Sequence, residues 1–112
     1  MRRFVAGTIV RVLQEDWAPF QNIRRTISEF MAQTGVKVEV MLSTIPEFWR
    51  LTEQSFLADE PAFDLIGADE IMLLQHARAG RVEALEPLIA AERYPLDDFE
   101  PAVLSALSHR GH

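Results

Sequence analysis

The sequence contains no cysteine, which excludes disulfide bridges, thiolate metal sites and cysteine nucleophiles. It has only three histidines, His76, His109 and His112, and their spacing forms no metal-binding motif. No apolar run approaches the roughly 20 residues that a membrane-spanning helix needs. Glycine is also scarce, with five residues, and no glycine-rich loop follows the first expected strand. The sequence therefore indicates neither a membrane segment nor a nucleotide or metal cofactor.

Positive charge is in short supply as well. The formal net charge is −6, and the basic residues form no continuous run or stripe along the sequence. Residues 1–35 carry five arginines, whereas the rest of the chain is strongly acidic. This balance makes nucleic acid an unlikely partner and favours a neutral or cationic ligand. Arg2 and Arg3 resemble the start of a signal peptide, but the apolar stretch that follows is too short, so we expect no signal peptide in this chain.

What is present is an alternation of strand and helix patterns. β-branched and apolar residues predict strands at 8–13, 36–42 and 63–68. Helical periodicity predicts a helix from about Pro19 to Gly35, packed through Phe20, Ile23, Ile27 and Phe30, with Asp16 as its N-cap. Further helices are expected from the Thr44 cap to before Pro61, at 70–79, at 87–92, and around Phe99 to Leu107 with Gly111 as the end. We expect capping boxes at Thr44 with Glu47 and at Asp97 with Glu100.

Connections of about 20 residues between the strands predict parallel pairing with right-handed crossovers. The predicted fold is α/β, a three-layer αβα unit with a small parallel sheet in the order 2-1-3. In the second expected helix, Trp49 is assigned to the core and Thr44 to the cap.

Ligands of open parallel sheets bind beyond the carboxyl ends of the strands, near the point where the strand order reverses. That rule selects seven candidate binding residues: Glu15, Asp16, Trp17, Ser43, Thr44, Asp69 and Glu70. Carboxylates accept hydrogen bonds from vicinal hydroxyls, and an indole covers the apolar face of a sugar ring. Asp16 and Asp69 have a second interpretation as helix N-caps, and Trp17 as a lid over the sheet edge. No catalytic or metal-binding residue is predicted, and an enzyme is not expected.

Several short segments, in order, resemble the N-terminal part of the family 1 extracellular solute-binding proteins, the sugar-binding subunits of ABC importers. They are Trp17 after the first strand, Glu29-Phe30, TGVKVEV at 34–40, FDLI at 63–66, Ala79-Gly80, Leu85 with Pro87-Leu88-Ile89, and Asp97-Asp98-Phe99. The chain departs from the family in carrying Asp59-Glu60-Pro61 where members commonly have a glycine. Family members also have several hundred residues in two lobes.

The resemblance implies that residues 1–112 form a single, incomplete α/β lobe, like part of a periplasmic binding protein, with the second lobe absent. It implies a receptor that binds a small polar ligand, by expectation a sugar, outside the cytoplasm and delivers it to ABC membrane subunits. We also expect this incomplete lobe to self-associate through the open edge of its third strand or its last helix. Two alternatives remain: a receiver-like or flavodoxin-like signalling module, for which Glu15, Asp16 and Asp69 are a loose match, and a structural fragment without a ligand.

Overall fold

The computed structural model describes residues 4–112. The chain divides into two compact units, the first ending at Gly67 and the second running from Ala68 to His112. No helix in the described residues is both long enough and apolar enough to cross a membrane.

The first unit is built on a three-stranded parallel sheet. Its strands are β1 (Ile9–Glu15), β2 (Lys37–Ser43) and β3 (Leu65–Ile66), in the order β2-β1-β3. The β1–β2 register runs from Ile9 opposite Lys37 to Glu15 opposite Ser43. The predicted parallel sheet and its strand order are therefore confirmed.

The third strand is shorter than the predicted 63–68. Pairing nevertheless continues on either side of β3, because the Asp64 N–H donates to the Arg11 carbonyl at 2.8 Å and the Gly67 N–H to the Leu13 carbonyl at 2.9 Å. The Asp64 carboxylate also accepts the Arg11 N–H at 2.8 Å. Asp64 thus has the structural role of fixing the start of β3 to the central strand.

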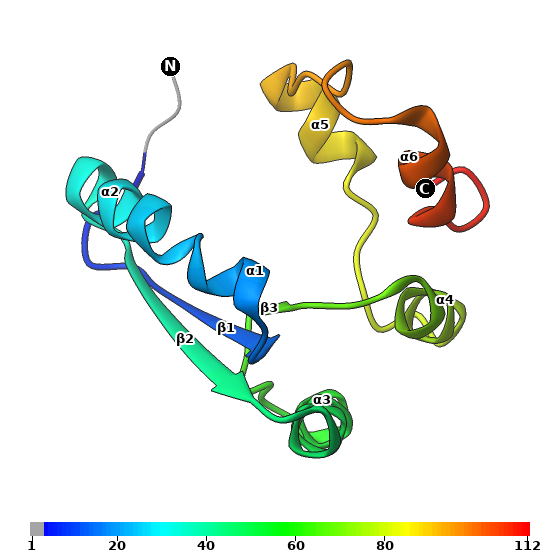
Figure 1. Ribbon diagram of the computed structural model, residues 1–112, viewed down its shortest axis with the longest axis horizontal. Helices are drawn as coiled ribbons and strands as arrows, with labels where there is room; N and C mark the ends of the chain where they lie inside the picture. The colour runs from blue at the N-terminus through cyan, green and yellow to red at the C-terminus, as the bar shows by residue number, and fades with distance from the viewer. Residues whose placement is uncertain (1–3) are drawn as a thin grey trace. The chain divides into compact units, whose positions relative to one another are not determined.

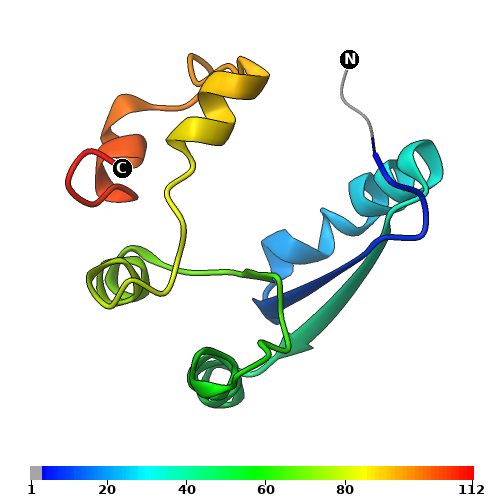
Figure 2. The same cartoon turned by 180° about the vertical axis from the view of Figure 1, so that it is seen from behind.

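Helices cover both faces of this sheet. Helices α1 (Ala18–Gln21) and α2 (Arg24–Thr34) lie on one side, and α3 (Ile45–Leu57) lies on the other (Figures 1 and 2). The first unit therefore has the three layers that the sequence predicts.

The buried core of the first unit lies between α3 and the central strand. Leu13 on β1 is 0% exposed and Phe48 on α3 is 1% exposed. Thr52 and Ser55 are buried on the same side of α3, because positions i, i+4 and i+7 share one helix face. Central strands have neighbours on both edges, so β1 supplies the most buried position of the sheet.

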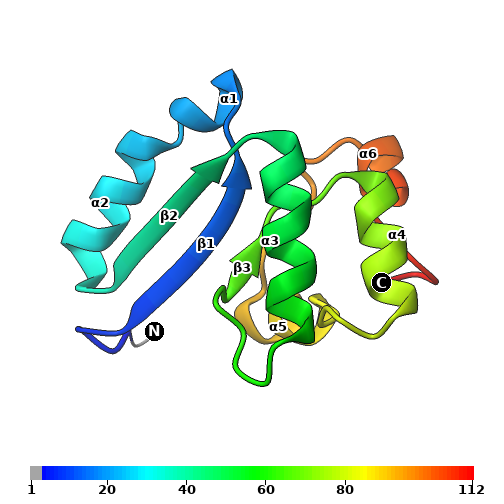
Figure 3. The same cartoon turned by 90° about the horizontal axis from the view of Figure 1, so that it is seen from below.

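The first predicted helix differs from the structure in two respects. It is interrupted around Asn22 and Ile23, and its N-cap is Trp17 rather than Asp16. The apolar side of α2 is not deeply buried, since Ile23 is 45% exposed and Phe30 is 37% exposed. The physical reason is position, because these helices run along the outer side of the edge strand β2, where little sheet surface remains to cover them (Figure 3). Gly35 ends α2 with a φ of 72°, as predicted.

The assignment of Trp49 to the core is wrong. Its side chain is 54% exposed, because the neighbouring Phe48 occupies the inner face of α3. Thr44 does stand at the N-cap of α3, but its side chain makes no capping hydrogen bond. Glu47 pairs with Arg50 instead, with Arg50 Nε donating to Glu47 Oε2 at 2.9 Å. This hydrogen bond lowers the pKa of Glu47.

The second unit is helical. It consists of α4 (Glu70–Arg78), α5 (Glu86–Glu92) and α6 (Pro101–Ala106). Asp69 caps α4 as predicted, its Oδ1 accepting the Met72 N–H at 2.7 Å. The predicted capping box at Asp97 is wrong: the N-cap of α6 is Glu100, whose side chain makes no capping bond.

Candidate functional site

The carboxyl ends of β1 and β2 lie side by side in the first unit. Glu15 is opposite Ser43, and the Asp16 N–H donates to the Ser43 carbonyl at 2.9 Å, which extends the ladder by one residue. The structure therefore brings the two predicted segments, 15–17 and 43–44, to one end of the sheet. We refer to Glu15, Asp16, Trp17, Ser43 and Thr44 as the strand-end rim.

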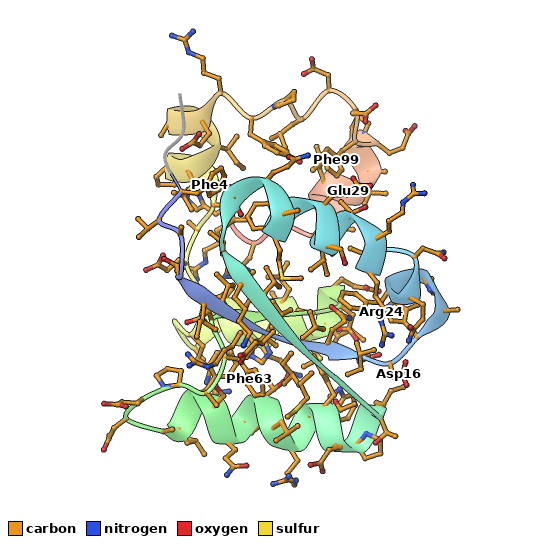
Figure 4. The ribbon with its side chains drawn as sticks, turned by 90° about the vertical axis from the view of Figure 1, so that its left-hand side faces the viewer. Phe4, Asp16, Arg24, Glu29, Phe63 and Phe99 are labelled. Carbon is orange, nitrogen blue, oxygen red and sulfur yellow. The ribbon has the colours of Figure 1, made fainter. Side chains whose placement is uncertain are left out.

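Asp16 contributes an exposed carboxylate to this rim. Its Oδ1 accepts a hydrogen bond from Gln21 Nε2 at 2.8 Å, so the side chain bridges to the end of α1 instead of capping its start. Figure 4 shows Asp16 beyond the end of the strands. The neighbouring Glu15 is half-buried at the last position of β1. Two consecutive carboxylates at one strand end form a set of acceptors suited to hydroxyl donors.

Trp17 presents its indole to solvent at this end of the sheet. The residue is extended and stands at the N-cap of α1, and its side chain is 54% exposed. An exposed aromatic surface next to carboxylates is the pairing that carbohydrate and polyol ligands require, since one group covers C–H surface and the other accepts O–H groups. Half exposure is compatible both with ligand stacking and with a lid over the sheet edge, so both interpretations of Trp17 stay predictions.

The two hydroxyl residues after β2 differ from one another. Ser43 Oγ is buried and makes no hydrogen bond with the described residues. Thr44 is exposed at the N-cap of α3, and its hydroxyl takes no part in capping. Of the two, Thr44 has the side chain that a solute reaches directly.

One residue at the same end of the sheet, Gln14, was missed by the sequence analysis. An added Cβ at Gly67 would lie 2.2 Å from Gln14 Oε1, so the Gln14 side chain rests against the Gly67 backbone where β1 and β3 end. A polar residue near the end of a buried strand is the signal that identifies Gln14. Its close approach to Gly67 has no sequence signal, because the two residues are 53 positions apart.

Asp69 and Glu70 belong to the second unit. Asp69 Oδ1 is engaged as the N-cap of α4, and Glu70 is exposed in the first turn of that helix. That these two residues join the other five around one ligand stays a prediction.

The chemistry of the strand-end rim is that of recognition by hydrogen bonds and stacking. Its groups are carboxylates, a hydroxyl and an indole. Across residues 4–112, no three or more His, Asp or Glu side chains are grouped so that they could hold a metal ion. The rim can accept hydrogen bonds from hydroxyl groups and can stack on a ligand's apolar face.

Comparison with protein-family models and with curated proteins gives no match. Among solved structures, the chain is similar to an ABC transporter solute-binding protein from Agrobacterium radiobacter K84 in complex with ribitol. The TM-score is 0.87 at 21% sequence identity, and the match covers 98% of this chain. It covers 28% of the other chain, so the present sequence spans little more than a quarter of that protein's length. The fold is therefore that of part of a solute-binding protein.

Proposed function

We propose that this chain forms part of the first lobe of a family 1 extracytoplasmic solute-binding protein, the receptor of an ABC importer. In this proposal the strand-end rim holds a small polar ligand of the sugar or polyol class. The observation that carries it is the match of 98% of the chain to a protein whose bound ligand is ribitol. Exposed carboxylate and indole groups on one end of the sheet are the second support.

Each rim residue has a distinct role in the proposal. Glu15 and Asp16 accept hydrogen bonds from ligand hydroxyls, and Thr44 adds a hydroxyl that donates or accepts. Trp17 covers the C–H face of the ligand. The role is binding rather than catalysis, and the delivery of the ligand to ABC membrane subunits outside the cytoplasm follows from the family resemblance.

Affinity should be low for this chain alone. We propose that residues 1–112 supply one wall of a cleft whose other wall belongs to a second lobe. High affinity in such proteins requires closure around the ligand, which removes water from both of its sides. We therefore expect dissociation constants in the millimolar range or weaker, and a micromolar value would contradict the one-wall arrangement.

The chain carries a matched pair of tryptophans for the test. Trp17 and Trp49 are both 54% exposed, but only Trp17 belongs to the rim. Ribitol and a panel of pentoses and hexoses would be titrated into the protein by calorimetry. We expect Trp17→Phe and Asp16→Asn to weaken binding and Trp49→Phe to leave it unchanged. Equal effects of the two tryptophan variants would contradict the assigned site.

We also propose that the chain self-associates. The outer edge of β3 pairs with no other strand in the described residues, and Leu65 is 58% exposed there. An open edge presents unpaired N–H and C=O groups to other chains. The net charge of −6 opposes association only weakly, because salt screens exposed charges beyond about 8–10 Å.

A further inference from the structure

The other edge of the sheet, formed by β2, has a regular arrangement of backbone groups. Lys37 and Ser43 bond to the β1 side, through Lys37 N–H to the Thr8 carbonyl at 2.8 Å and the Ser43 carbonyl to Asp16 N–H at 2.9 Å. Alternate residues of a strand point their backbone groups in opposite directions. The N–H and C=O groups of Val38, Val40 and Leu42 therefore point outward, away from β1.

One of these outward groups is already satisfied. The Val38 N–H donates to Met31 Sδ of α2 at 3.3 Å. No backbone hydrogen bond within the described residues involves the outward N–H groups of Val40 and Leu42. Exposed strand edges of this kind are sites where an extended chain can add as a further strand.

A groove runs beside this part of the edge. It has a volume of about 250 Å³ and lies between the first two helices and β2. Its apolar walls are formed by Phe20, Ile27 and Met31 from the helices and by Val38, Val40 and Leu42 from the strand. Figure 3 shows α1 and α2 following the outer side of β2 along its length. A helix beside an open strand edge gives an added strand both backbone partners and a wall for its side chains.

Among the described residues, Arg24 is the only charged side chain that lines the groove. It makes no ion pair within the described residues, whereas the adjacent Arg25 pairs with Glu29 at 3.8 Å. Figure 4 shows Arg24 extending from the helix toward the carboxyl end of the sheet. An arginine at the margin of an apolar groove favours a carboxylate, which it can bind through two parallel hydrogen bonds.

We propose that this groove binds an extended peptide segment of a partner protein. The segment pairs with the outward groups of Val40 and Leu42 as an added strand, packs alternate apolar side chains against the groove, and places an acidic side chain at Arg24. Pairing of two copies through their β2 edges fits less well, because the groove side of β2 carries only valine and leucine. The one carboxylate of β2, Glu39, lies on the other face and pairs with Lys37 at 3.1 Å.

The test uses the full chain and a synthetic peptide, acetyl-Val-Thr-Val-Thr-Glu-amide, in a ¹⁵N HSQC titration. In an extended strand its two valines and its glutamate share one face, so all three can meet the groove and Arg24. We expect the shifts to concentrate at residues 38–42 and the amide exchange of Val40 and Leu42 to slow. Arg24→Gln should weaken binding about tenfold, the loss expected for one charge-assisted contact. Replacing glutamate by glutamine in the peptide should have a similar effect, and Arg25→Gln should have none.

A backbone variant separates strand addition from simple charge attraction. Val40→Pro removes an outward N–H and leaves the ladder to β1 intact, which edge strands tolerate. The Val40→Pro variant should abolish the protection of the β2 amides from exchange that the peptide produces. If Val40→Pro does not fold, the comparison of wild type with Arg24→Gln still tests the proposal. Shifts elsewhere than β2, or equal binding by wild type, Arg24→Gln and Arg25→Gln, would overturn the proposal. Protection of Val40 that rises with protein concentration without peptide would assign the edge to a second copy instead. None of these outcomes depends on ligand binding at the strand-end rim.

Discussion

Phe48 and Trp49 are adjacent aromatic residues of α3 that the structure places in opposite environments. Phe48 is 1% exposed and packs toward β1, whereas Trp49 is 54% exposed. Truncation of a buried phenylalanine to alanine costs about 3–5 kcal/mol, because both the transfer free energy and a residual cavity contribute. A half-exposed tryptophan loses about half of a full burial energy, and alanine returns part of this through its helix propensity, so we expect about 1 kcal/mol.

The two variants can be compared directly by urea denaturation. The free energy of unfolding falls by about 1–3 kcal/mol per molar urea in small proteins, so Phe48→Ala should lower the midpoint by roughly 2 M and Trp49→Ala by about 0.5 M. Far-UV circular dichroism is the suitable probe, since one variant changes the tryptophan content. If the two units unfold separately, amide exchange at Leu13 reports the unfolding of the first unit alone. Equal destabilisation by the two variants, or a larger effect of Trp49→Ala, would refute the assignment of the core to the α3–β1 interface.

Three further predictions follow from the described contacts. Within residues 4–112 the buried Thr52 hydroxyl has no hydrogen-bond partner, so Thr52→Val should leave stability unchanged or raise it by up to about 1 kcal/mol in the same denaturation assay. A loss of more than about 1 kcal/mol would show that the hydroxyl is bonded. In Gly67→Ala the new Cβ must displace the Gln14 amide, so the Gln14 side-chain NMR signals should move while stability falls by less than about 1 kcal/mol. Sedimentation at low micromolar concentration should detect dimers or larger species, and a monomer with slowly exchanging β3 amides would contradict association through that edge.

The strand order and the alternation of elements could be predicted because they depend on local patterns. β-branched runs locate β1 and β2 within a residue or two, the Thr44 cap locates the start of α3, and the length of the crossovers predicts parallel pairing. The identity of the inward-facing residues is a different matter. Phe48 and Trp49 both belong to the apolar arc of their helix, and only the position of β1 decides which one is buried.

The strand-end rim likewise has some features that the sequence predicts and others that only the structure reveals. The convergence of 15–17 with 43–44 follows from parallel pairing, so it could be predicted from the sequence. The hydrogen-bond partner of Asp16 could not be predicted, because its carboxylate has two possible local partners, the amides of the following helix and the Gln21 side chain. In the structure it bonds to Gln21. The contact of Gln14 with Gly67 depends on the tertiary placement of β3 and lies beyond any local pattern.

The most direct test of the proposed function is a ¹⁵N HSQC titration of the wild-type chain with ribitol at concentrations up to several hundred millimolar. If the rim receives a polyol, the amide signals of 15–17 and 43–44 and the indole N–H of Trp17 will shift together along one binding curve. The indole N–H of Trp49, equally exposed on α3, will stay in place. Shifts of both indoles to the same extent, or no shift at the rim with any member of the sugar and polyol panel, would contradict the proposal.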